Sequence, residues 1–406
     1  MKYIKLFLNH QDYESYITGS TAVLPNVSLC DSENEVHYNK KGDEPVIPTN
    51  VIMYYAPSKL TETTSQKTAG LHTNAFNTTI SSHDFEDGVG TITFADDVTT
   101  VGSYAFYSAS TVTKVEIPNS VTSIGANAFE YCSGSTSINI PTGVTSIGNY
   151  AFSNCIGLTS VNIPTGVTSI ANYAFLNCRN LTSITIPSGV TSIETNAFSN
   201  CSSLTSITLG SGVTSIGTSA FNGCKSLTSI KVDSNNTVYD SRNNCNAIIE
   251  TSTNTLIQGC NNSIIPNSVT RIGESAFNGR SSLSSISIPD SVTSIGANAF
   301  YNCIGLTSVN IPTGVTSIAN YAFYRCAGLT SITIPSGVTS ISSYAFEDCS
   351  GLTSVTIYAI APPSLGTGTF DNNASGRKFY VPSESVNTYK SSEYWSGYAS
   401  DILPIT

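Results

Sequence analysis

The sequence has few charged side chains for a chain of 406 residues. Only 11% of its residues are Asp, Glu, Lys or Arg, against about 25% in a typical soluble domain. The formal net charge is −10 and Lys and Arg do not cluster, which argues against a protein that binds nucleic-acid phosphates. Ser, Thr, Asn and Gly take the place of the charges, and they give a surface that forms hydrogen bonds but attracts partners only weakly over long distances.

Histidine is almost absent. The four His residues are His10, His37, His72 and His83, so residues 84–406 contain none. A Ser-His-Asp or Cys-His catalytic arrangement therefore cannot form within that segment. Carboxylates that could act in pairs are scattered, and no glycine motif for phosphates or dinucleotides is present in a suitable context. These absences predict a protein that is not an enzyme and that holds no cofactor and no metal ion.

Long hydrophobic runs are also missing. No stretch approaches the ~18 apolar residues of a membrane-spanning helix, so we expect no membrane insertion. The chain begins MKYIKLFLN, a short apolar segment that polar residues follow at once. A secretory leader needs a longer apolar region and a small-residue cleavage site. We therefore predict no cleaved leader in this sequence, and the route of any export stays open.

What the sequence does contain is a repeat with a unit of about 23 residues, a period typical of solenoid proteins. An Ala-Phe dipeptide marks each unit, and its Phe recurs with this period from Phe106 to Phe221 and from Phe277 to Phe346. The interval from Phe221 to Phe277 is more than twice the period, so one unit there carries a long insertion. Segments 155–175 and 303–323 are identical, which indicates duplication within the gene.

Each unit has the pattern of two extended segments and a turn. Val161 and Ile163 alternate with polar residues, as in a half-buried strand. Pro164 ends this strand because it has no N–H to donate. Val167 and Ile170 are expected to face inward from the second segment, and the Ala-Phe marker closes the coil. One unit cannot bury this apolar face alone, whereas stacked units can.

The pattern LTSVxIPxGVTSIGxxAFxxC resembles the BspA-like subgroup of leucine-rich repeats, which occurs in bacterial surface proteins. The resemblance covers residues 91–357, where the pattern recurs ten times. It implies a right-handed, mainly β solenoid with a parallel sheet along one face. The unit departs from the general leucine-rich pattern, because Gly166 and Val167 occupy the place of the usual Asn ladder, and we therefore expect little helix. The resemblance also implies a cell-surface or extracellular location.

The pattern divides the chain into three parts. Residues 1–70 carry more charge and are predicted to form a β-rich N-terminal module or cap, with strands at 3–8 and 51–55. Residues 71–357 form the solenoid, in which residues 233–262 are predicted to be a hairpin insertion with its turn at 251–254. Residues 358–406 are predicted to be a C-terminal cap, with a strand at 378–382 and aromatic residues that cover the last coil.

Eleven cysteines are present, and most of them occupy a repeat position. No paired short spacing typical of a zinc site occurs, so we expect buried free thiols, with disulfides between neighbouring coils as the alternative. Eight cysteines lie at the third position after the marker Phe: Cys132, Cys155, Cys178, Cys201, Cys224, Cys303, Cys326 and Cys349.

Two further cysteines and a group of oxygen-bearing side chains lie in the insertion. If its hairpin pairs Glu250 with Thr255, the same register places Cys245 opposite Cys260, and a disulfide between them is possible. A calcium loop is a weaker alternative, because the spacing of an EF-hand is absent, and we interpret its candidate ligands as turn residues. These candidates are Asp233, Asn235, Asn236 and Asp240.

The outward positions of the first extended segment form the candidate binding face. They are mostly small and polar, so solubilising surface is the alternative interpretation. Tyrosines also recur at the second position before the marker Phe, where we expect them to pack on the neighbouring turn, with an interface role as the alternative. The candidate binding face consists of Lys114, Glu116, Asn139, Asn162, Thr185, Thr208, Lys231, Asn310, Thr333 and Thr356.

Together these features predict a non-enzymatic binding or adhesion protein whose partner is a protein or a cell-surface ligand. The alternative is a structural or receptor-binding component of a larger assembly, such as a phage particle, which the missing leader favours. The regular hydroxyl rows leave recognition of carbohydrate or ice open as a third interpretation. Any enzymatic turnover is expected within residues 1–90, which hold all four His residues.

Overall fold

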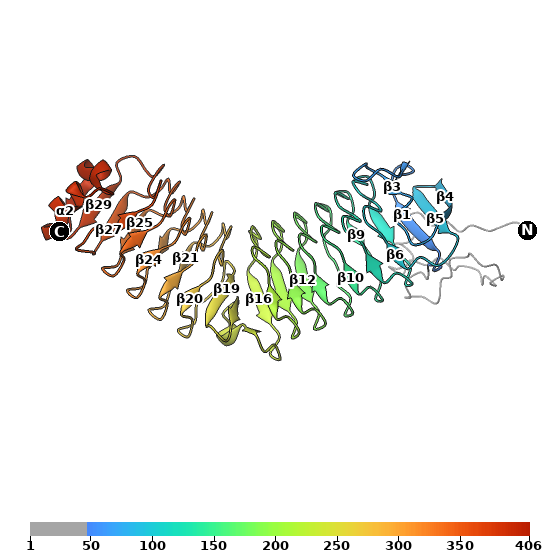
Figure 1. Cartoon of the computed structure of the whole chain (residues 1–406), viewed down its shortest axis with the longest axis horizontal. Helices are drawn as coiled ribbons and strands as arrows, with labels where there is room; N and C mark the ends of the chain where they lie inside the picture. Colours follow the sequence, from blue (N-terminus) through green and yellow to red (C-terminus); the bar gives the residue numbers. More distant parts are fainter. Residues whose placement is uncertain (1–46) are drawn as a thin grey trace, which may run out of the picture.

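The computed structural model describes residues 47–406, which form a β-solenoid of about 13 turns. Figure 1 shows the coils stacked in one continuous, bent array, with β1 (Val51–Tyr55) near one end and α2 (Val386–Ser391) near the other. Parallel sheets join neighbouring coils, and helix accounts for 5% of the structure. The predicted fold class, a mainly β repeat solenoid with little helix, is confirmed.

Most coils contribute two short strands, one on each side of the Pro-containing turn. Strands before the turn lie in one row, which we name the first-strand sheet, and strands after it lie in a second row, the second-strand sheet. Each row is divided into several hydrogen-bonded sheets. In both sheets a residue pairs with the residue one unit further on, as Ser183 does with Ser206 and Ser192 with Ser215. This register follows from the constant length of the unit, since each inward Ile or Val then meets its counterpart in the next coil.

The strands of the first-strand sheet in the repeats are β7 (Lys114–Glu116), β9 (Ser137–Ile138), β12 (Ser183–Ile186), β14 (Ser206–Leu209), β16 (Ser229–Val232), β21 (Ser285–Ile286), β23 (Ser308–Val309), β25 (Ser331–Ile334) and β27 (Ser354–Ile357). Those of the second-strand sheet are β6 (Thr100–Val101), β8 (Ser123–Ile124), β10 (Ser146–Ile147), β11 (Ser169–Ile170), β13 (Ser192–Ile193), β15 (Ser215–Ile216), β20 (Arg271–Ile272), β22 (Ser294–Ile295), β24 (Ser317–Ile318), β26 (Ser340–Ile341) and β28 (Ser364–Leu365).

The marker Phe side chains form two continuous stacks in the core. One runs from Phe106 to Phe221 and the other from Phe277 to Phe370, with neighbouring ring centroids 5.1–5.5 Å apart and ring planes within 7° of parallel. Every ring in both stacks is buried. Aromatic contacts of this kind add to the free energy gained from burial alone. The predicted inward placement of the marker Phe is therefore confirmed.

The repeat cysteines are buried free thiols, as predicted. Each Sγ donates a hydrogen bond to the carbonyl oxygen of the marker Phe in the preceding coil, as Cys178 does to Phe152 over 3.1 Å. Burial raises the pKa of the Cys178 thiol to about 12, so it stays protonated and remains a donor. These cysteines therefore link neighbouring coils without disulfides. The remaining cysteine, Cys30, lies outside the described residues.

Threonine hydroxyls link the coils along two further lines. Before the Pro-containing turn, Thr182 Oγ1 donates to the Thr159 carbonyl over 3.2 Å, and Thr205 Oγ1 donates to the Thr182 carbonyl over 2.9 Å. After the turn, Thr214 donates in the same way to Thr191 over 3.2 Å. In most coils the Thr that precedes the Ser-Ile or Ser-Val strand is thus a structural donor.

The marker turn requires a left-handed backbone at two positions of each coil. In one coil these are Tyr173 and Asn177, both with φ of 59°. Asn tolerates this conformation better than most residues, which explains its recurrence at the second position after the marker Phe. Gly223 and Gly279 occupy the same position with φ of 69° and 73°.

The N-terminal end of the solenoid is covered by antiparallel strands. β4 (Ile80–Glu86) and β5 (Val89–Phe94) form a hairpin, β5 pairs with β1, and β1 pairs with β7 of the first coils. The short strands β2 (Glu62–Thr63) and β3 (Leu71–His72) pair in parallel beside it. The predicted strand at 51–55 is confirmed as β1, whereas the predicted strand at 3–8 lies outside the described residues.

The C-terminal end is covered by two strands and short helices. β29 (Lys378–Val381) and β30 (Ile402–Pro404) extend the first-strand sheet, and η2 (Ser383–Ser385), α2 and η3 (Ser396–Asp401) lie between them in the chain. Trp395 is fully buried against Phe379, with ring centroids 5.2 Å apart, and its indole nitrogen donates to the Pro363 carbonyl. The predicted strand at this place is confirmed.

The insertion forms the expected hairpin but with a changed register. Its elements are β17 (Tyr239–Asp240), η1 (Arg242–Asn244), β18 (Ala247–Glu250) and β19 (Thr255–Gly259). Glu250 pairs with Thr255 as predicted, but a β-bulge then shifts the register, so that Ile248 pairs with Gln258.

This shift removes the predicted alignment of Cys245 with Cys260. Both cysteines are free thiols, and Cys260 Sγ donates to the Asn246 carbonyl over 3.2 Å. The disulfide that the symmetric register allowed is therefore not formed, because the bulge displaces one strand by a residue relative to the other.

A buried arginine joins the two halves of the array at the insertion. Gly259 takes the place of a marker Phe, since its N–H bonds to the Ala276 carbonyl as the N–H of Phe198 bonds to that of Ala220. Arg280 stands at the repeat position of the cysteines and is fully buried. Its guanidinium donates to the carbonyls of Gly259, Cys224, Asn278 and Phe221 over 2.9–3.3 Å.

This arginine therefore continues the hydrogen bonds of the cysteine column across the interruption in the Phe stack. Figure 1 shows that the array bends in the same region, between β16 and β19.

Candidate binding faces

The candidate binding face is exposed along most of its length. Lys114 and Thr356 are half-buried, and Glu116 is buried. The exposed members are Asn139, Asn162, Thr185, Thr208, Lys231, Asn310 and Thr333.

Glu116 was expected to face solvent, and that expectation is wrong. β1 lies antiparallel beside β7 and sets Met53 opposite Glu116, which is only 3% exposed and forms an ion pair with Lys114. A pairing between strands that lie so far apart in the chain is not visible in a periodic pattern, so the repeat alone did not reveal it.

The hydroxyls of the candidate binding face differ from those of the threonine lines between coils. Within the described chain, the structure gives no hydrogen-bond partner to the side-chain hydroxyls of Thr185, Thr208 and Thr333. Each of these residues lies at the outward third position of a four-residue strand that pairs fully with its neighbour. The backbone of these strands is therefore satisfied within the sheet, while the hydroxyls remain available to a partner.

Asn at the same position accompanies shorter strands. The coils that carry Asn139 and Asn310 have first strands of only two residues, and the coil of Asn162 has none. In the coil of Asn310, the side-chain amide exchanges two hydrogen bonds with the backbone of Ile288 in the preceding coil, over 2.9 and 2.7 Å. The side chain thus replaces part of the strand ladder, as short polar side chains tend to do.

This interruption leaves a shallow open groove on the first-strand sheet. It has a volume of about 430 Å³ and is lined by residues of β21, β23 and their flanks: Ser285, Ile286, Ser287, Ser308, Val309 and Asn310. The groove is open and lacks charged groups, so it suits an extended segment of a partner more than an enclosed small molecule.

The tyrosines before the marker Phe pack on the neighbouring coil, as predicted. The ring centroids of Tyr150 and Tyr173 lie 4.6 Å apart, and those of Tyr321 and Tyr344 lie 4.9 Å apart. Stacking turns the ring faces toward one another, so mainly ring edges and hydroxyls reach the solvent. The main role of these tyrosines is therefore structural. The edge of the solenoid that they line, along the turns at the marker Phe, is a second candidate surface beside the candidate binding face.

The N-terminal sheet contains a linear arrangement of a carboxylate, an imidazole and a phenol. His83 Nδ1 lies 2.8 Å from Glu62 Oε1, and His83 Nε2 lies 2.7 Å from the hydroxyl oxygen of Tyr54, which also accepts the Leu60 N–H over 2.9 Å. The sequence alone could not predict this arrangement, because only the fold brings Tyr54, Glu62 and His83 together. Tyr54 is fully buried, so this oxygen cannot touch a substrate, and the arrangement acts as a structural link.

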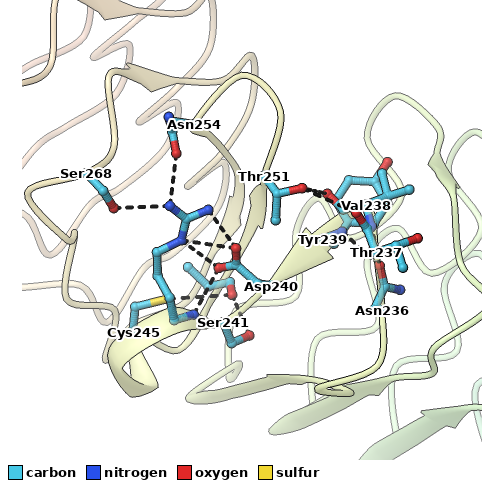
Figure 2. Close-up of polar contacts among 12 residues, drawn as sticks. Asn236, Thr237, Val238, Tyr239, Asp240, Ser241, Cys245, Thr251, Asn254 and Ser268 are labelled. Atoms are coloured by element: carbon cyan, nitrogen blue, oxygen red, sulfur yellow. Dashed lines mark hydrogen bonds and ion pairs between the residues drawn. The ribbon is translucent and has the colours of Figure 1, made fainter.

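The possible calcium ligands of the insertion bond within the protein instead. Asp240 accepts two hydrogen bonds from Arg242 Nε and forms an ion pair with its terminal nitrogen over 2.6 Å. Figure 2 shows Asp240, Asn254 and Ser268 converging on this guanidinium by dashed contacts. Asp233 accepts the N–H of Asn235. These side chains fix the turns of the insertion, which agrees with their interpretation as turn residues.

The sequence matches the family model described as the BspA type leucine rich repeat region, in six copies over residues 61–178, 124–249 and 249–377. These matches cover well over half of the chain. The chain belongs to the BspA-type leucine-rich-repeat family. The family is a repeat scaffold, and among the described residues no helix of this BspA-type chain is long and apolar enough to cross a bilayer.

Solved structures of bacterial proteins resemble this BspA-type solenoid. A leucine rich cell surface protein of Faecalibacterium prausnitzii is 31% identical over 74% of this chain and 86% of its own, with a TM-score of 0.57. The pneumococcal vaccine antigen PcpA is 21% identical over 80% of this chain and 88% of its own, with a TM-score of 0.61, and shares the fold. No curated protein matches the chain.

Proposed function

We propose that this BspA-type chain is a non-enzymatic protein that binds a protein or cell-surface ligand through the candidate binding face. The observation that carries the proposal is that two groups of threonines differ in whether their hydroxyls are already hydrogen-bonded. Hydroxyls at the coil junctions donate to the neighbouring backbone, whereas those of Thr185, Thr208 and Thr333 are exposed and have no partner in the described chain. A flat row of available hydroxyls and amides suits hydrogen bonding with another macromolecule.

A location on the cell surface or outside the cell is part of this proposal. It is supported by the family and by the similar Faecalibacterium protein, which is described as a cell surface protein. The buried thiols need no oxidant to be stable, since each is a hydrogen-bond donor shielded from solvent. The alternative, a display component of a larger particle, uses the same face and differs only in where the protein is found.

The test uses the full chain and two triple variants. Thr185→Lys, Thr208→Lys and Thr333→Lys together place bulky charges on the candidate binding face. Ser146→Lys, Ser215→Lys and Ser317→Lys together place the same charges at exposed positions of the second-strand sheet as the matched control. Binding of labelled protein to immobilised extracellular-matrix extract and to whole bacterial cells is measured for all three proteins.

Loss of binding in the first variant alone supports the candidate binding face. Equal binding by all three proteins, or equal loss in both variants, contradicts it. Detection of the native protein in particle fractions, with no binding to matrix or cells, favours the display component.

A further inference from the structure

The first-strand sheet changes from polar to apolar where it meets the C-terminal cap. Along its second outward position, Thr333 lies beside Thr356, Thr356 beside Tyr380, and Tyr380 beside Leu403. Tyr358 stands at the second position beyond Thr356, where other coils have Pro, as at Pro335. Pro382 and Ile405 come directly after the two cap strands, β29 and β30. We name the set Tyr358, Tyr380, Pro382, Leu403 and Ile405 the apolar end patch.

The apolar end patch is not part of the core of the cap. Tyr358 is 50% exposed and Leu403 is 37% exposed, and the other three members are half-buried. The side chains that close the last coil, Trp395 and Tyr389, are fully buried on the opposite side of β29 and β30. Apolar side chains that stay exposed or half-buried at neighbouring positions of a sheet indicate an interface with another molecule.

The outer edge of the sheet is blunted against a further strand. The Ile405 N–H donates to the Val381 carbonyl over 2.8 Å, so it points toward β29. Successive N–H groups of a strand point to opposite sides, which directs position 404 toward the open edge of β30. Pro404 has no N–H to offer there, and proline at this place blunts an edge. A partner is therefore expected on the face of the patch and not along its edge.

We propose that the apolar end patch packs against the same patch of a second copy of this chain, as a two-fold dimer. The charges beside the patch are self-complementary, because Lys378 and Asp401 form an ion pair of 2.7 Å, and each is about one-third exposed. A two-fold axis can therefore set Lys378 of one copy near Asp401 of the partner subunit without a repulsive contact. The same apolar sheet face can pack on both copies without a protrusion on one that fits a pocket on the other. A two-fold contact also gives a closed dimer and not an open chain of copies.

The expected affinity is low. Five side chains make a contact at the small end of specific interfaces, below about 1,200 Å² in total, so association in the micromolar range is expected. The dimer would carry two candidate binding faces, which increases the apparent affinity for a ligand that is itself repeated on a surface.

Sedimentation equilibrium of the full chain from micromolar to millimolar concentration tests the proposal. The wild type is expected to approach twice the monomer mass and to dissociate on dilution. Tyr358→Asp and Leu403→Asp are each expected to weaken association by about tenfold or more, because they bring an unpaired carboxylate into an apolar contact. Ile304→Asp is the matched control, since Ile304 is 49% exposed and lies outside the patch.

Circular dichroism shows whether each variant retains the fold, and two patch variants keep the test valid if Leu403→Asp disturbs β30. A wild type that is monomeric at every concentration overturns the proposal. The same conclusion follows if Ile304→Asp weakens the dimer as much as the patch variants, or if the dimer persists in both folded patch variants.

Discussion

Replacing Arg280 by Cys, the residue of most other coils at this position, is expected to destabilise the array at its middle. A cysteine thiol can still reach the Gly259 carbonyl, as the other thiols reach a carbonyl one coil back, but it cannot reach the carbonyls of Phe221 and Cys224. A buried carbonyl that loses its donor costs about 1–3 kcal/mol. Burial lowers the pKa of Arg280, so holding its charge in the core carries a free-energy cost that the variant recovers. The net loss is expected to be about 2–4 kcal/mol.

The effect should also be local. The core forms two clusters of buried residues that meet at the insertion, and in a repeat array each coil is stabilised by its neighbours alone. Urea unfolding followed by circular dichroism is therefore expected to split into two transitions in Arg280→Cys. Hydrogen exchange should become faster at 221–224 and 259–262 before other regions. Arg179→Cys is the control, because Arg179 is exposed and its loss should change stability by less than about 0.5 kcal/mol. Unchanged unfolding of Arg280→Cys would refute the role of the guanidinium as the link between the two halves.

Three further predictions concern the core, the thiols and the N-terminal sheet. Phe198→Ala should cost about 3–5 kcal/mol in urea unfolding, since it opens a cavity within a continuous stack of buried rings; a variant as stable as the wild type would contradict that packing. The repeat cysteines should react with a thiol reagent only as fast as the array unfolds, because burial raises the pKa of Cys132 and Cys303 to about 12; rapid labelling in native buffer would contradict their role as buried donors. Burial lowers the pKa of His83 below its ordinary 6.5. At acidic pH the unfolded state therefore binds a proton on His83 more readily than the folded state does. The contribution of His83 to stability is then complete above pH ~6.5 and is lost as the pH falls through its folded pKa. The protection factors for hydrogen exchange at 80–94, which are corrected for the intrinsic pH dependence of amide exchange, should fall between pH 7 and 5 in the wild type and fall less in His83→Gln, whereas an equal fall in both would assign the change to other groups.

The regular part of the fold could be predicted from the sequence because every coil repeats the same local contacts. The inward Phe, Ile and Val side chains, the buried thiols and the strands expected at 51–55 and 378–382 follow from periodicity and composition. The burial of Glu116 could not be predicted, since it depends on β1 reaching the sheet from a distant part of the chain. The role of Arg280 was visible only as a departure from the Cys column, and its partners come from its own coil and from two earlier coils.

Within the candidate binding face, the pattern predicted which side chains point outward but not which of them are already engaged. Asn310 and Thr333 occupy equivalent positions, yet the amide of Asn310 is bonded to Ile288 while the hydroxyl of Thr333 has no partner in the described residues. The residue type carried a signal, because Thr at this position accompanies four-residue strands and Asn accompanies shorter ones. The threonines at the coil junctions carried a signal as well, in their recurrence at one place before each strand.

The constant register between neighbouring coils has a consequence for how such a gene can change. Every junction contact, from thiol to carbonyl, hydroxyl to carbonyl and ring to ring, joins one unit to the next at a fixed offset. Recombination between the identical segments 155–175 and 303–323 would remove the insertion and Arg280 together and would fuse the flanking coils in register. The array can therefore be lengthened or shortened by whole units at little folding cost, so that its reach can vary among lineages while the coil itself is kept.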